Sequence, residues 1–176
     1  MEIDYEGNNK QMYISDIKNN QITVWNTERC EFVGSIDINS PLEMKFDSLY
    51  LFVTSGISFK LSQTGKVESI EKGSNTIFVL DKIFPFQIKR EISRNDWLSL
   101  STLHMTSNKF LYTIAYEVND NQEKSEFKYF FQIDESGNVL KKILLEGIKY
   151  LCDVVFLNNK IIICSTNEIK IIKFNE

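Results

Sequence analysis

The segment Ile3–Ile36 reads IDYEGNNKQMYISDIKNNQITVWNTERCEFVGSI, and the rest of the chain is best interpreted from it. It contains short apolar or alternating runs, such as residues 11–16 and 21–25, and each run is bounded by Asn, Asp, Gly or Lys residues. Runs of this length are typical of β-strands, and the polar clusters between them favour tight turns. The segment therefore predicts four short antiparallel strands joined by turns.

The same order of strands and turns recurs along the chain. Residues 42–70 repeat it, and residues 150–174 repeat it again but stop after a third strand. The third strands of the repeats are expected to begin near Ile22, Ile57, Phe127 and Ile169. Their spacing indicates a repeat of about 35 residues, with a degenerate copy expected between Gly73 and Leu98.

Four short strands in a unit of this size are typical of a β-propeller, in which each repeat forms one sheet, or blade, that stacks on its neighbours. The predicted fold class is all-β: a propeller-like array of about four to five short antiparallel blades, with an incomplete or open array left as an option, in one domain spanning residues 1–176. An antiparallel sandwich or barrel is the alternative. The register between residues 73 and 98 stays open, because residues 76–88 fit two strands about Pro85 whereas residues 91–97 fit a polar loop equally well.

Residues 3–36 resemble a blade of the NHL-type β-propeller family. That family's pattern is a strand, an Asp-Gly-Asn turn, a Tyr-Val-Ala-Asp strand, then Asn-Asn-Arg-Ile-x-Val-Phe and Gly-x-Phe; the counterparts here are Tyr13-Ile14-Ser15-Asp16 and Asn19-Asn20-Gln21-Ile22-Thr23-Val24-Trp25. The resemblance is weaker over residues 42–70 and 150–174. Gln21 stands where arginine is usual, and Cys30 stands where a glycine precedes Glu31. The resemblance implies the propeller fold and specifies no chemistry.

Composition agrees with an all-β fold and argues against several partners. The chain has 22 Ile but a single Ala, Ala115, which favours sheet over helix. Lys and Arg number 20 against 24 acids, so nucleic acid is not an expected partner, and the local cluster Lys89, Arg90 and Arg94 is expected to be solvated surface. The N-terminus lacks a signal-peptide pattern, and the apolar runs fall short of the roughly 18 residues of a membrane span, so we expect no membrane partner and a cytoplasmic location.

The sequence predicts neither an enzyme nor a bound cofactor. His104 is the one histidine, and no Gly-x-Ser-x-Gly motif occurs, so catalytic and metal-binding histidine clusters are not expected. Cys30, Cys152 and Cys164 form an odd number without Cys-x-x-Cys spacing, which argues against both a disulfide framework and a zinc site. Cys152 and Cys164 lie in apolar runs and are expected to pack as small hydrophobic side chains.

A propeller enzyme or ligand-binding domain with a central metal or sugar site is the alternative function. Propellers resembling the lactonases bind calcium on the central axis through oxygen ligands, and the side chains available here by type are Asp16, Asn26, Asp47, Glu117, Asp134 and Asp153. The same residue types cap the tight turns that every blade needs, and turn capping is the interpretation we favour.

The main functional prediction is a non-catalytic protein–protein interaction module. Aromatic residues gather at protein interfaces, and they exceed the apparent needs of the core at Tyr5, Trp25, Phe84, Phe86, Trp97, Phe130 and Phe131. The last repeat lacks a fourth strand after Phe174, so open strand edges are expected to pair with a protein partner or a second copy of the chain.

The alternation also predicts which side chains are buried. These lie at the centres of the second and third strands of the repeats: Ile14, Val24, Phe52, Phe59, Ile114, Phe130, Ile162 and Ile171. Residues 118–126 are polar and are expected to form a solvent-exposed loop between two strands.

Overall fold

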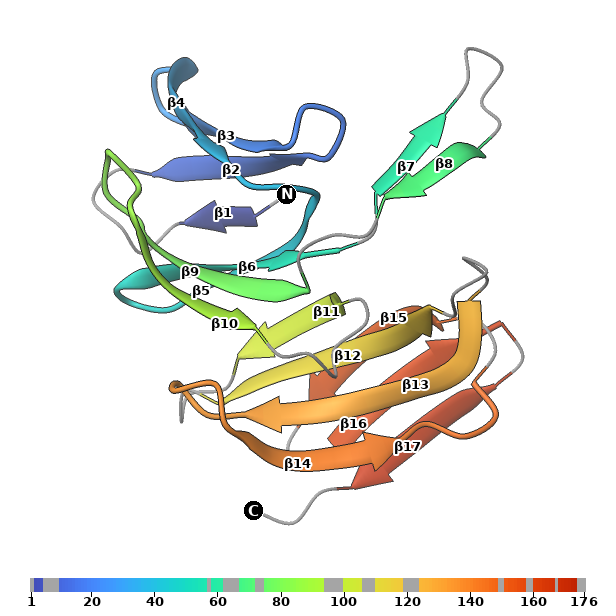
Figure 1. Ribbon diagram of the computed structural model, residues 1–176. Coiled ribbons are helices and arrows are strands. Elements are labelled where there is room, and N and C mark those ends of the chain that lie inside the picture. The colour runs from blue at the N-terminus through green and yellow to red at the C-terminus, as the bar shows by residue number, and fades with distance from the viewer. Residues whose placement is uncertain are drawn as a thin grey trace.

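The computed structural model describes residues 2–4, 10–56, 58–61, 67–71, 75–93, 100–105, 110–118, 124–148, 151–157, 160–166 and 168–173. Within these ranges the chain forms strands only, arranged as four antiparallel sheets and one separate hairpin (Figure 1). The sheets follow one another along the chain and stack face to face. The predicted all-β array of four to five blades is therefore confirmed, with four sheets.

The first sheet has the strand order that its sequence predicts. It consists of β1 (Glu2–Asp4), β2 (Gln11–Asp16), β3 (Gln21–Asn26) and β4 (Glu31–Asp37), paired in that order. Cys30, in the turn before β4, has a backbone φ of 55°. This left-handed conformation favours glycine, which explains why glycine is usual at this position in the resembling pattern.

The second sheet corrects the predicted register. It contains β5 (Pro41–Phe46), β6 (Tyr50–Ser55), β9 (Thr76–Asp81) and β10 (Ile88–Ser93), in the order β10-β9-β6-β5. The sequence predicted that the next strand along the chain, β7 (Ser58–Leu61), would pair with β6 in this sheet. In the described chain β7 pairs only with β8 (Val67–Glu71).

Consequently the described part of the stretch 73–98, residues 75–93, forms no degenerate blade of its own. The two described strands of this stretch, β9 and β10, complete the second sheet. β6 pairs directly with β9, and the β7–β8 hairpin is inserted between these two strands in the sequence. The register that the sequence left open is settled here: strands lie on both sides of Pro85, but the second begins only at Ile88, and residues 91–93 belong to β10 rather than to a loop.

The third sheet contains β11 (Leu100–Met105), β12 (Leu111–Val118), β13 (Lys124–Ile133) and β14 (Val139–Leu144). The fourth contains β15 (Leu151–Leu157), β16 (Lys160–Ser165) and β17 (Ile169–Lys173). Of the predicted polar loop at 118–126, Val118 ends β12, residues 124–126 begin β13, and the remainder lies outside the described residues. In the described chain β1 pairs with β2 and β17 with β16, so these two strands do not close a ring by pairing with each other.

Three apolar clusters hold consecutive sheets together. The first joins Ile22 and Val24 of β3 to the second sheet, the second joins Ile77 and Val79 of β9 to the third sheet, and the third joins the third sheet to the fourth. Phe130 and Phe131 are adjacent on β13, and both are 0% exposed. Because neighbouring strand residues point to opposite faces, the third sheet is covered on both sides.

Burial agrees with the sequence where the side chain faces a neighbouring sheet. Val24, Phe52, Ile114 and Phe130 are buried as predicted, whereas the side chain of Phe59 lies outside the described residues. Ile14 and Ile162 are only half-buried, and the prediction for Ile171 is wrong, because this side chain is 58% exposed. These three exceptions lie on the first and fourth sheets, which have a neighbouring sheet on one side only (Figure 1).

Candidate functional site

The fourth sheet carries an apolar face that the described chain leaves open. We define the front face of this sheet as the row of Val155, Ile162 and Ile171 together with Ile169 and Leu157. Val155 pairs with Ile162, and Ile162 with Ile171, so these three side chains lie on one side of the sheet. Ile169 and Ile171 are 70% and 58% exposed. On the opposite side, Ile161 and Ile163 pack against the third sheet.

The exposed residues of β17 occupy positions that are buried in other third strands. Asn20, Asn75 and Asn167 each begin the pattern Asn-x-Ile-x-Val/Ile, which places Ile22 and Val24, Ile77 and Val79, and Ile169 and Ile171 at corresponding positions. The first two pairs are 0–1% exposed and face the following sheet. Ile169 and Ile171 therefore project from the side of the fourth sheet on which a following sheet would pack.

The first sheet has a second open face, on the opposite end of the array. We define the back face of the first sheet as Met12, Ile14, Trp25 and Phe32. Met12 pairs with Trp25, and Trp25 with Phe32, whose rings are 5.4 Å apart. Phe32 is 55% exposed, and the other three are half-buried.

The corresponding positions of the second sheet are buried. Leu51 pairs with Leu80, as Met12 pairs with Trp25, and both leucines are 0% exposed in the cluster shared with the first sheet. The two open faces are completed by residues that the sequence did not predict to lie at an interface: Met12, Phe32, Val155, Leu157 and Ile169. An alignment of the third strands on their Asn-x-Ile pattern would have identified Ile169.

The aromatic residues predicted to lie at an interface divide into core and surface. Phe86, Phe130 and Phe131 are buried, whereas Phe84 is 64% exposed in the loop between β9 and β10. Phe84 contacts Phe86 edge to face, with ring centroids 5.7 Å apart. Trp25 belongs to the back face, and Tyr5 and Trp97 lie outside the described residues.

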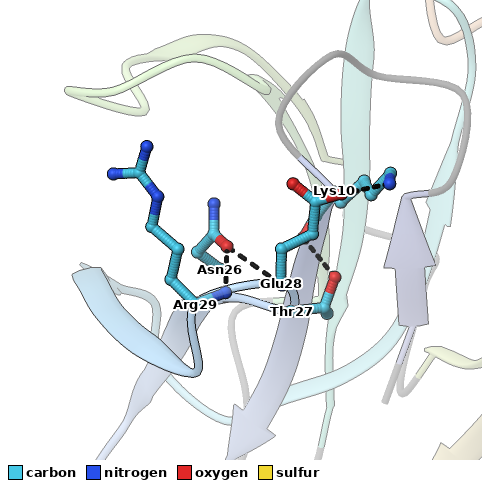
Figure 2. Close-up of polar contacts among 5 residues, drawn as sticks. All are labelled: Lys10, Asn26, Thr27, Glu28 and Arg29. Atoms are coloured by element: carbon cyan, nitrogen blue, oxygen red, sulfur yellow. Dashed lines mark hydrogen bonds and ion pairs between the residues drawn. The ribbon is translucent and has the colours of Figure 1, made fainter.

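Several of the oxygen side chains considered for calcium accept hydrogen bonds from backbone N–H groups in turns. The Asn26 Oδ1 atom accepts hydrogen bonds from the backbone N–H groups of Glu28 and Arg29, at 3.0 and 2.9 Å (Figure 2). Two further contacts join this turn to Lys10. The Glu28 carboxylate forms an ion pair with Lys10, and the Thr27 hydroxyl donates a hydrogen bond to the Lys10 carbonyl at 2.7 Å (Figure 2). Turn capping is therefore confirmed for Asn26.

Three aspartates act in a similar way. Asp47 accepts from the backbone of Leu49 and Tyr50, and Asp16 and Asp134 accept from backbone and side-chain amides of asparagines three and four residues later. These bonds lower the pKa of the Asp16 and Asp134 carboxyl groups, chiefly through the asparagine side chains. Asp153 accepts from its neighbour's backbone N–H, and the Glu117 side chain lies outside the described residues. Among the described residues, no group of three or more His, Cys, Asp or Glu could hold a metal ion.

The basic residues Lys89 and Arg90 line a cleft of about 300 Å³ beside the second sheet. Asp47 and Glu135 line the same cleft, and the Lys89 Nζ atom lies 2.9 Å from an oxygen of Asp81. Acidic side chains thus offset the positive charge here, and the cleft does not present a basic surface to a polyanion. Arg94 lies outside the described residues.

His104 has a packing role in the structure. Its ring stacks on Phe156 of the fourth sheet, with centroids 4.0 Å apart and planes within 1° of parallel. Burial, and secondarily the positive charge of Lys45, lower the pKa of His104. Cys30 and Cys164 are free thiols, exposed and half-buried respectively, and the Cys152 side chain lies outside the described residues.

Comparison with known proteins identifies the fold. No protein-family model matches the chain, and no curated protein matches its sequence. Hydrazine synthase of Kuenenia stuttgartiensis matches in structure with a TM-score of 0.66 and 18% identity, over 87% of this chain and 40% of that one. The Pan2 WD40 domain of Neurospora crassa matches with a TM-score of 0.53 and 14% identity, over 92% of this chain and 44% of that one.

These matches show a β-propeller fold. This chain spans less than half the length of either matched chain. At this level of identity they show the fold alone. The described residues include no helix with the length and hydropathy required to span a membrane.

Proposed function

We propose that this protein is a non-catalytic protein–protein interaction module built on a β-propeller scaffold. The observation that carries the proposal is the front face of the fourth sheet, where Ile169 and Ile171 are 70% and 58% exposed beside Val155 and Leu157. Contiguous apolar side chains exposed on one face mark interaction surfaces. Propeller sheets normally have both faces covered by neighbours, and a protein partner supplies the missing cover.

Within the propeller class, we propose that the blades are of the NHL type. The support is the first sheet, in which the second and third strands coincide with the segments that resemble the family pattern. The positive φ of Cys30, at the position where that pattern has glycine, adds to this support.

The function is tested by affinity capture from the native cells with three forms of the tagged chain: wild type, Ile171→Lys and Leu140→Lys. Leu140 is a matched control, because it is 52% exposed on β14 and lies outside the front face. The wild type and the control are expected to retain the same bound protein, an untagged copy of this chain included, and Ile171→Lys is expected to lose it. Equal recovery with all three forms would contradict the proposal.

The calcium alternative is tested separately by thermal unfolding with calcium and with a chelator. A ligand that binds only the folded state raises the melting temperature. Because Asn26, Asp47 and Asp134 are engaged in turns, we expect the two melting curves to coincide. A rise of more than a few degrees with calcium would instead support a central metal site.

A further inference from the structure

The chain contains the same kind of sheet-to-sheet interface three times, and all three interfaces join the sheets in the same orientation. The side of one sheet that carries Ile22 and Val24, or Ile77 and Val79, always packs on the opposite side of the following sheet. In the third sheet, Phe130 has this role toward the fourth. Each interface therefore joins a front face to a back face, and never two equivalent faces.

The two open faces are the two halves of one further interface of this kind. The front face of the fourth sheet has Ile169 and Ile171 where the first sheet has the buried Ile22 and Val24. The back face of the first sheet has Met12 and Trp25 where the second has the buried Leu51 and Leu80. Each face thus carries apolar side chains at the positions that the buried interfaces use, while Asp153, Lys160 and Lys173 lie on the same side of the fourth sheet in the rows next to Val155, Ile162 and Ile171.

One copy does not bring these halves together. The three apolar clusters of the described residues join first to second, second to third and third to fourth sheets. The first and fourth sheets lie at the two ends of this series (Figure 1). A front-to-back contact between them must therefore involve different molecules.

We infer that the front face of the fourth sheet binds the back face of the first sheet of a second copy, so that two copies form a closed head-to-tail ring of eight sheets. This inference rests on the proposed function and names its partner. Head-to-tail contacts form rings when the rotation closes. Four sheets cover 44% of the Pan2 WD40 chain, so two copies approximate one full ring, and eight sheets lie within the usual range of about four to eight blades.

The chemistry of the two faces predicts how the association responds to salt. The central row of the front face, Val155, Ile162 and Ile171, is uncharged, and the pair Trp25 and Phe32 supplies aromatic surface on the back face. Such an interface depends on apolar burial, and salt screens charge pairs rather than apolar contacts. The dimer is therefore expected to persist at about 1 M NaCl, where the Debye length is about 3 Å.

The experiment measures the mass of the purified chain by analytical ultracentrifugation over a range of concentrations. The wild type, with a chain mass of 20.6 kDa, is expected at twice that mass. Ile171→Lys on the front face and Phe32→Glu on the back face are each expected to raise the dissociation constant about 30-fold or more, as for a hot-spot residue. Leu140→Lys is expected to remain a dimer. Circular dichroism checks folding, and Ile169→Lys replaces Ile171→Lys if the latter does not fold.

Mixing the two variants tests the polarity of the contact. A head-to-tail dimer of Ile171→Lys with Phe32→Glu contains one interface of wild-type composition and one in which the introduced lysine and the introduced glutamate have opposite charges. The mixture is therefore expected to recover the dimer that each variant alone loses. No recovery would overturn the head-to-tail arrangement. A wild type that stays monomeric would overturn self-association, whereas the proposed function would survive if Ile171 still governed capture of another protein.

Discussion

Truncation of Phe130 and Phe131, one at a time, tests whether the third sheet is covered on both faces. The two residues are adjacent on β13 and both are 0% exposed. Phe130 packs with Tyr112 and Phe156 toward the fourth sheet, and Phe131 belongs to the cluster shared with the second sheet. In a sheet with one solvated face, one of the two truncations would cost little. In this structure both should be costly.

The expected cost follows from the burial. A fully buried phenylalanine removes at least about 150 Å² from water, which is worth about 4 kcal/mol at roughly 25 cal/mol per Å². This area term is an upper bound because the unfolded chain is partly compact, while the cavity left by truncation adds to the loss. We therefore expect Phe130→Ala and Phe131→Ala each to lower the free energy of unfolding by about 3–5 kcal/mol.

Urea unfolding followed by circular dichroism at one fixed protein concentration measures this loss. For an m-value of about 2 kcal/mol/M, a 4 kcal/mol loss lowers the unfolding midpoint by about 2 M. Leu140→Ala, at a position 52% exposed, is the control and should change stability by less than about 0.5 kcal/mol. If either phenylalanine variant behaves like this control, the corresponding face is not covered and stacking of the sheets around the third is refuted.

Three further predictions concern Cys30, Gly137 and His104. Cys30→Gly should raise the free energy of unfolding by about 0.5–1 kcal/mol, because the backbone φ of 55° strains a residue with a side chain, whereas Cys30→Ser should give no gain in the same urea assay. Gly137→Ala should cost about 1–3 kcal/mol, since its φ is +90° and its new Cβ would lie 2.8 Å from Ile92; Gly34→Ala, with nothing nearer than 3.5 Å, should be tolerated. Burial lowers the pKa of His104, so the unfolded state binds the proton first. Stability should be constant above about pH 6.5 and fall as the pH drops below it, and His104→Asn should lose this part of the pH dependence.

Local pattern was sufficient for the individual strands, because each depends on residues near it in sequence. Residues 11–16 and 21–25 alternate and end at Asn or Asp residues that accept backbone hydrogen bonds in turns, as Asn26 does. Turn capping by Asp16 and Asp47 was predictable for the same reason. The resemblance to the family pattern also indicated that Cys30 occupies a position where glycine is usual, and the backbone φ of Cys30 is positive in the structure.

The pairing of β6 with β9 could not be predicted from local pattern. Ser58–Leu61 has the length and alternation of a strand, and it follows β6 directly, so the repeat assigned it to the same sheet. Thr76–Asp81 has an equally suitable pattern and occupies that place instead, with Leu51 opposite Leu80. β7 and β9 are thus two candidates for the same edge of β6. Which of them pairs there depends on burial against the neighbouring sheets, and the local sequence pattern does not reveal that burial.

The incomplete burial of Ile14 and Ile162 and the error at Ile171 have a common cause that is itself informative. Ile14, Ile162 and Ile171 lie on strands that the alternation assigned correctly, yet they are exposed or half-buried because their faces belong to the first and fourth sheets. If these faces normally met water, their central positions would be expected to carry polar residues, as solvated faces of antiparallel sheets do. Val155, Ile162 and Ile171 instead keep an apolar row across three strands. The pattern of the sequence therefore describes a sheet with cover on both sides, and the structure of one chain supplies cover on only one.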